Sequence, residues 1–83
     1  MPTVAEEDGF RIRVFGPPRE HPPVHAHVEY GTDGLVVVRL RTRLKPQEVW
    51  AVYGMKDRDV ITAYRLVEKY EIAIRTAWRN MHG

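Results

Sequence analysis

The stretch from Val24 to Arg41, Val-His-Ala-His-Val-Glu-Tyr-Gly-Thr-Asp-Gly-Leu-Val-Val-Val-Arg-Leu-Arg, decides the fold of this chain. In its first seven residues, apolar side chains alternate with two histidines and one glutamate, a period of two that is typical of a half-buried strand. Gly31-Thr32-Asp33-Gly34 follows and predicts a hairpin turn. A second alternating segment, Leu35 to Arg41, completes the hairpin. The stretch therefore predicts two antiparallel strands that share one apolar face.

Two further segments predict strands on either side of this hairpin. Phe10 to Phe15 alternates strictly between apolar residues and arginines, and Glu48 to Tyr53, closed by Gly54, is a weaker strand candidate. Between the first of these and the hairpin lies the segment from Gly16 to Pro23. Its four prolines forbid a helix and most ladder hydrogen bonds, so we expect a rigid loop.

From Asp57 onward the apolar period changes to 3.6 residues, which indicates an amphipathic helix. No proline or glycine interrupts the pattern before Gly83, so we predict one helix of about six turns. Its apolar stripe has only the apolar sheet face to cover. The expected fold class is α+β, a mainly antiparallel sheet of three to four strands with one long C-terminal helix packed on one face.

The composition indicates one small domain that spans residues 1–83, with residues 1–8 as a flexible segment. Hydrophobic residues make up 43% and charged residues 29% of the chain, as in ordinary globular proteins. A domain of this size has a thin margin of stability and no cysteine to add disulfides, so we expect association with a partner or into a homo-oligomer. No apolar run approaches the ~20 residues that span a bilayer, and Met1 to Asp8 lacks a signal-peptide pattern. We therefore expect a cytoplasmic protein without a membrane partner.

Strand parity predicts which residues lie on the sheet face opposite the helix. These residues are Arg11, Arg13, His25, His27, Glu29, Arg39 and Arg41. The net charge is only +2, yet this arrangement concentrates four arginines on one open surface, where guanidinium groups can bind nucleic-acid phosphates. The candidate nucleic-acid-binding residues are Arg11, Arg13, Arg39 and Arg41. Alternatively, this face is polar only because it is exposed to solvent, as one side of an antiparallel sheet commonly is.

Three of the four histidines, His21, His25 and His27, fall within seven residues, and three interpretations of them remain open. They can supply acid and base for metal-independent RNA cleavage, which needs no cofactor. They can instead bind a divalent transition metal, with Glu29 as an added oxygen ligand. They can also be structural, with His21 capping the loop. His82, in the last predicted helical turn, is favourable beside the negative end of the helix dipole.

Several segments are similar to a known family. The residues Met1-Pro2-Thr3-Val4, the motif His21-Pro22-Pro23-Val24-His25-Ala26-His27-Val28-Glu29-Tyr30-Gly31 and the segment from Arg65 to Trp78 resemble domain-of-unknown-function family 4160, a family of small bacterial and archaeal proteins. The resemblance covers nearly the whole chain. It departs from the family at the extra Gly16-Pro17-Pro18-Arg19 and at the acidic Glu6-Glu7-Asp8. It implies the toxin half of a type II toxin–antitoxin pair, with a small antitoxin-like protein as the partner.

The leading hypothesis is therefore a toxin-like component of a prokaryotic toxin–antitoxin module that acts on RNA as a metal-independent ribonuclease. Its candidate catalytic residues are His25, His27 and His21. One alternative is a non-enzymatic module that binds protein or nucleic acid through the same sheet face. The other is a small metal-binding protein, whose ligands would be His21, His25, His27 and Glu29.

Overall fold

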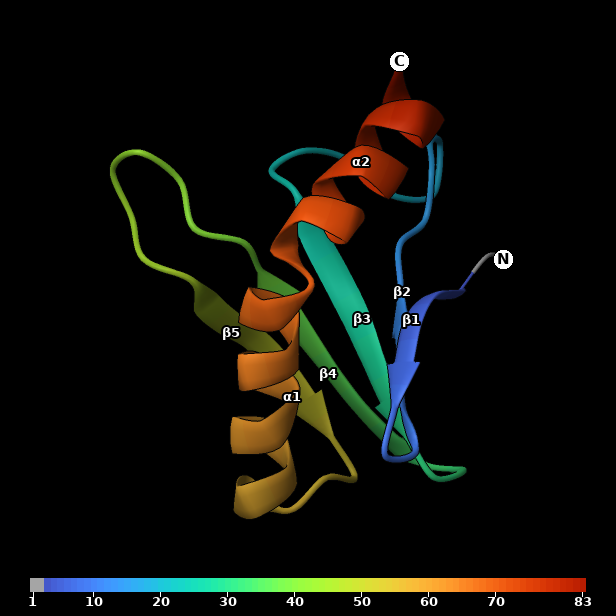
Figure 1. Cartoon of the computed structure of the whole chain (residues 1–83), viewed down its shortest axis with the longest axis vertical. Coiled ribbons are helices and arrows are strands. Elements are labelled where there is room, and N and C mark those ends of the chain that lie inside the picture. Colours follow the sequence, from blue (N-terminus) through green and yellow to red (C-terminus); the bar gives the residue numbers. More distant parts are fainter. Residues whose placement is uncertain (1–2) are drawn as a thin grey trace.

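The computed structural model describes residues 3–83 as one antiparallel sheet backed by two helices (Figure 1). The five strands lie in the sheet in the order of the chain. The elements are β1 (Thr3–Glu7), β2 (Phe10–Arg13), β3 (His25–Tyr30), β4 (Gly34–Arg39), β5 (Glu48–Tyr53), α1 (Asp57–Lys69) and α2 (Glu71–His82). The α+β class and the antiparallel sheet are confirmed, whereas the numbers of strands and helices differ from the prediction. Neither helix of the described residues has the length and apolarity needed to cross a membrane.

The strand that the sequence analysis missed is β1, which lies where we expected a flexible segment, residues 1–8. It pairs with β2 in antiparallel register, with Glu7 opposite Phe10. The connecting residues Asp8 and Gly9 have φ values of 51° and 85°. Two successive positive φ angles are typical of a type I′ hairpin turn, for which Asp-Gly is a preferred sequence. The first two residues of the expected flexible segment lie outside the described residues.

The prediction of a single C-terminal helix is wrong, because the helix breaks at Tyr70. Tyr70 has φ −103° and ψ 21°, although neither proline nor glycine stands there. Its hydroxyl and the ammonium of Lys69 both donate to Oε1 of Glu7 on β1, each at 2.7 Å. Both hydrogen bonds lower the pKa of Glu7, and the one from Lys69 has the larger effect. The break lets α1 pack against β4 while α2 reaches β1 (Figure 1).

The core lies between the helices and one face of the sheet, as strand parity predicted. The buried residues of the strands are Phe10, Ile12, Ala26, Val28, Val36 and Val38, with Val14 and Leu40 just beyond the ends of β2 and β4, and the buried helix residues are Ala63, Leu66, Val67, Ile74 and Trp78. Val24 packs partly buried against them. Because successive residues of a strand point to opposite faces, this core also fixes which side chains lie on the outer face.

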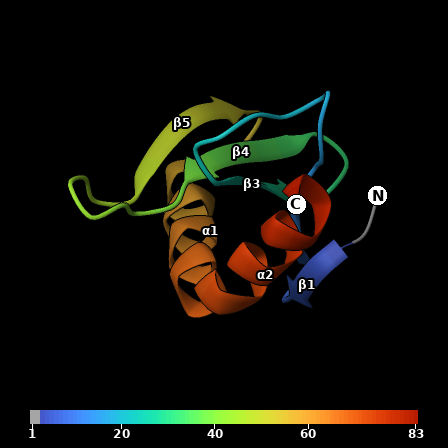
Figure 2. The same cartoon turned by 90° about the horizontal axis from the view of Figure 1, so that it is seen from above.

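Two connections leave the plane of the sheet. We call residues 16–23, between β2 and β3, the proline segment; it passes over the sheet on the side away from the helices (Figure 2). We call residues 41–46, between β4 and β5, the basic arm; it projects away from the body of the molecule (Figure 1). The first connection completes a candidate site on the outer face, and the second presents a separate surface.

Candidate metal centre

His25 and His27 lie two residues apart on β3, so their side chains point to the same face of the sheet. Their cross-strand neighbours on β4 are Arg39 and Val37. The centroids of the two imidazole rings are 6.0 Å apart. The structure therefore brings these two histidines together on the outer face, as strand parity predicted.

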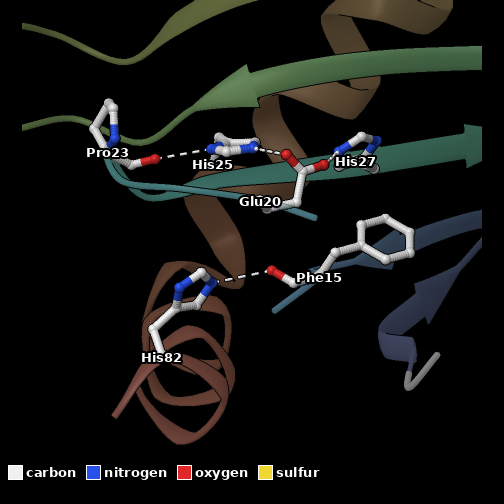
Figure 3. A network of polar contacts seen from close by, with 6 residues as sticks. All are labelled: Phe15, Glu20, Pro23, His25, His27 and His82. Carbon is white, nitrogen blue, oxygen red and sulfur yellow. Dashed lines mark hydrogen bonds and ion pairs between the residues drawn. The ribbon is translucent and has the colours of Figure 1, made fainter. Parts of the chain in front are cut away.

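Glu20, from the proline segment, completes the site by placing its carboxylate between the two rings (Figure 3). Oε2 of Glu20 lies 3.0 Å from Nε2 of His25, and Oε1 lies 2.7 Å from Nε2 of His27. The ligand atoms of these three residues all lie within 4.8 Å of one another. Ligand atoms around a tetrahedral zinc ion are about 3.3 Å apart, so a small adjustment would close this group around one ion. We call Glu20, His25 and His27 the His–Glu centre.

The ring of His25 faces an oxygen atom on each side. Nδ1 lies 2.8 Å from the carbonyl oxygen of Pro23. A carbonyl only accepts, so Nδ1–H must donate, and a neutral ring then directs the lone pair of Nε2 at the carboxylate of Glu20. Two lone pairs repel each other, so this arrangement needs a cation between them, either a proton or a metal ion. Imidazole nitrogen and carboxylate oxygen are zinc ligands, and Nδ1–H donation to a backbone carbonyl is how metal-binding histidines are commonly oriented.

Glu20 is held in its ionised form by its two histidine partners. Burial works to raise the pKa of Glu20, but the hydrogen bonds with His25 and His27 outweigh burial, and the pKa lies below its ordinary value. An ionised carboxylate is the form that binds a metal ion. The centre therefore offers one anionic oxygen ligand and two imidazole nitrogens.

Aromatic side chains enclose the centre. The ring of His25 is 5.1 Å from the ring of Trp50 and 5.1 Å from that of Trp78, and His25 is only 5% exposed. Phe15 meets the ring of His27 edge-on at 4.8 Å. These contacts remove water from the imidazoles, which strengthens the interaction of the carboxylate with any cation bound there.

His82 lies beside the centre rather than in it (Figure 3). Its Nε2 donates to the carbonyl oxygen of Phe15 at 3.0 Å, and its ring stacks on Trp78 with centroids 3.8 Å apart. The last turn of α2 is thereby fixed to the chain just before the proline segment. This contact gives His82 a structural role beyond the favourable dipole interaction that its position predicted.

Two of the metal ligands that we predicted, His21 and Glu29, lie elsewhere. His21 is exposed on the proline segment. Glu29 lies 3.4 Å from Nε of Arg11 and 3.4 Å from Nε of Arg13. The candidate ligand that the sequence analysis missed is Glu20, whose position depends on the path of the proline segment and on no strand or helix period. Its place next to His21 in the sequence is the only signal that could have drawn attention to it.

The four arginines that we predicted to bind nucleic acid do not form one cationic surface, because each of them pairs with a carboxylate. The pairs are Arg11 and Arg13 with Glu29, Arg39 with Glu48, and Arg41 with Glu71. Arg39 is also buried and donates to the carbonyl oxygen of Pro46. Arg41 lies beyond the end of β4 and pairs with α2, so it is not on the sheet face at all. The three arginines that lie on the outer face therefore share two carboxylates, Glu29 and Glu48, which reduces the attraction of this face for phosphates.

Comparison of this chain with protein-family models, with curated proteins and with solved structures finds no match. Membership in family 4160, which the motif predicts, therefore stays a prediction.

Proposed function

We propose that this chain is a small metal-binding protein whose His–Glu centre holds one divalent transition-metal ion, with zinc as the best match. The observation that carries the proposal is the convergence of three ligand atoms, from Glu20, His25 and His27, within 4.8 Å of one another. The carbonyl oxygen of Pro23, 2.8 Å from Nδ1 of His25, supports it by directing Nε2 toward the ion.

The geometry favours metal binding over metal-independent RNA cleavage. A catalytic acid or base must come within hydrogen-bonding reach of the group it acts on. His25 is 5% exposed, and both of its ring nitrogens already face oxygen atoms of the protein. In addition, the arginines of the outer face pair with carboxylates, so fewer guanidinium groups are free to bind a phosphate.

Three protein ligands leave room for a further ligand, an arrangement found in catalytic zinc sites. If zinc binds there, it would supply a bound water molecule with a lowered pKa. The chain's own residues orient the ring of His25 through Pro23 and exclude bulk water with Trp50 and Trp78.

Titration of the untagged, metal-free protein with Cu²⁺ tests the proposal directly. The chain has two tryptophans, and the rings of both lie 5.1 Å from the ring of His25. A Cu²⁺ ion at the centre should therefore quench most of the tryptophan fluorescence at one equivalent. Zn²⁺ bound beforehand should raise the concentration of Cu²⁺ that is needed for quenching, because the two ions compete for one site and Cu²⁺ binds such ligands more tightly. Elemental analysis of protein purified without a tag should find bound metal.

Variants of the centre and of the neighbouring histidine provide the matched comparison. Glu20→Gln, His25→Ala and His27→Ala should each weaken Cu²⁺ binding by more than the ~10–100-fold expected for loss of an orienting partner, because each removes a ligand. His21→Ala removes an exposed histidine of the same motif and should leave the affinity unchanged. Equal affinity in all four variants, or a loss confined to His21→Ala, would contradict the proposed centre.

The resemblance to family 4160 supports a second proposal, that the protein works in a toxin–antitoxin pair with a small antitoxin-like protein. Strand β5 lies at an edge of the sheet and offers a surface for such a partner. Its side chains Trp50, Val52 and Tyr53 are 45%, 44% and 59% exposed. Aromatic side chains are enriched in protein interfaces. Expression of the chain alone should arrest bacterial growth, and co-expression of the partner should relieve the arrest; normal growth in both cultures would exclude the toxin role.

A further inference from the structure

The positive charge of the chain is concentrated in one short segment. The residues from Arg39 to Gln47 contain four cations and no carboxylate, and the cations are Arg39, Arg41, Arg43 and Lys45. The whole chain has 13 basic and 11 acidic residues, so the remainder carries nine basic and eleven acidic side chains and is net negative. The net positive charge of the protein therefore comes from the basic arm and from Arg39, which precedes it.

Hydrogen bonds make the tip of the arm a rigid turn. The backbone N–H of Thr42 donates to the carbonyl oxygen of Lys45 at 2.8 Å. Oγ1 of Thr42 accepts from the backbone N–H of Leu44 at 3.2 Å and from that of Lys45 at 3.0 Å. Arg43 and Leu44 are thus held at the outermost point of the arm, and the side chain of Leu44 is 90% exposed.

The base of the arm is fixed to the body of the protein on both sides. Arg75 of α2 donates to the carbonyl oxygen of Arg41 at 2.6 Å. On the other side, Nε2 of Gln47 donates to the carbonyl oxygen of Tyr64 at 2.9 Å. A preorganised arm loses little conformational entropy when it binds, which favours a binding role over a merely flexible connection.

The shallow clefts beside the arm are also cationic. One is lined by Arg41, Thr42, Arg43, Glu71 and Arg75, with three guanidinium groups against one carboxylate. The other is lined by Arg39, Lys45, Pro46, Gln47 and Glu48, with two cations against one carboxylate. An anionic ligand that follows the arm would therefore meet a positive surface on each side of it.

The composition of the arm identifies the class of anion. Protein interfaces are enriched in aromatic anchors and depleted in Lys, whereas the arm has no aromatic residue and its one exposed apolar residue, Leu44, is followed by Lys45. Single-stranded nucleic acids are bound by aromatic stacking platforms, and no aromatic residue lies between Arg39 and Gln47. Proteins that bind the minor groove of duplex DNA combine Arg and Lys with an apolar wedge, often Leu, that enters between base steps. The arm matches this last pattern.

We propose that the basic arm binds duplex DNA in the minor groove, with Arg43 and Lys45 on phosphates and Leu44 as a wedge against the base pairs. This surface is separate from the His–Glu centre and does not depend on the metal. If these two cations contact phosphates, the affinity should fall about 10-fold between roughly 50 and 200 mM salt.

The test measures binding of the full chain to a labelled A·T-rich duplex by fluorescence anisotropy at both salt concentrations. The variant Arg43→Glu/Lys45→Glu should abolish binding at the higher salt concentration. The control Arg58→Glu/Arg79→Glu makes the same change in net charge at two exposed helix positions and should bind better than the arm variant at either salt concentration. Equal losses in the two variants would mean that the arm is not the binding surface.

The wedge is tested in the same duplex with 2-aminopurine, whose fluorescence rises when a base step is unstacked. Leu44→Ala should still bind but should lose the rise, whereas Ile72→Ala, at a position 83% exposed on α2, should keep it. Binding to single-stranded RNA or to an acidic peptide with no binding to duplex DNA overturns the proposal. A fluorescence rise that survives in Leu44→Ala overturns the wedge.

Discussion

At the scale of single residues, the state of Nε2 of His25 distinguishes a metal centre from a simple hydrogen-bonded pair. Because the carbonyl of Pro23 accepts from Nδ1, the hydrogen should stay on Nδ1 whether or not metal is bound. Zinc should therefore displace only the interaction at Nε2. Long-range ¹H–¹⁵N spectra of the two states should show a protonated Nδ1 in both and a changed Nε2 after zinc is added. A zinc-bound form in which Nδ1 has lost its hydrogen would mean that Pro23 does not orient this ligand.

The same residue scale shows what the sequence could predict of the candidate site. Parity placed His25 and His27 together because a strand has a fixed period, and it placed Glu29 on the same face for the same reason. It could not place Glu20, whose carboxylate arrives from a loop with no period. The pairing of Glu29 with Arg11 and Arg13 follows from the register of β2 against β3, in which Arg11 lies opposite Glu29. The alternation of residues along one strand does not determine which residues of two strands lie opposite each other. The sequence pattern therefore could not predict that Glu29 pairs with these arginines.

At the scale of elements, the sequence predicted four of the five strands and the helical region, and the two misses have different causes. The hairpin of β1 and β2 had a signal in Asp8-Gly9, but the acidic residues before it masked the strand pattern. The helix break at Tyr70 had no local signal, because its cause lies in contacts of Lys69 and Tyr70 with Glu7, more than sixty residues away. A break of this kind depends on tertiary structure and cannot be deduced from helix propensity.

The packing of α2 on the sheet gives a prediction at this scale. Ile74 is fully buried at 0% exposure, whereas Ile72, on the same helix, is 83% exposed. Ile74→Ala should lower the free energy of unfolding by about 2–5 kcal/mol, because it removes buried methyl groups and leaves a cavity. Ile72→Ala should change it by less than about 0.5 kcal/mol. Urea denaturation followed by circular dichroism measures both values, and similar losses in the two variants would argue against the helix orientation described above.

At the scale of the whole molecule, side-chain contacts between distant elements supplement a small core. Glu71 at the start of α2 accepts from Arg41, beyond β4, at 3.1 Å and from Arg75 at 2.9 Å. Glu7 of β1 joins the helix junction through Lys69 and Tyr70, and Glu20 joins the proline segment to β3. The pKa of each of these three carboxyls is lowered in the folded protein. All three contacts therefore stabilise the fold only while the carboxyl is ionised.

Acid should weaken these contacts, and Glu71 provides the test. The hydrogen bond from Arg75 is the main cause of its lowered pKa, with a further contribution from Arg41. Because the folded pKa lies below the ordinary value of 4.5, the stabilisation is complete above pH 4.5 and is lost as the pH falls through the folded pKa. Glu71→Gln should therefore lower the melting temperature at neutral pH and have a much smaller effect at a pH well below 4.5. Glu68→Gln, at an exposed position of α1, makes the same change in charge and should have little effect at either pH. Thermal unfolding of the wild-type protein and both variants at the two pH values measures this, and a pH-independent effect of Glu71→Gln would show that its contribution is not ionic.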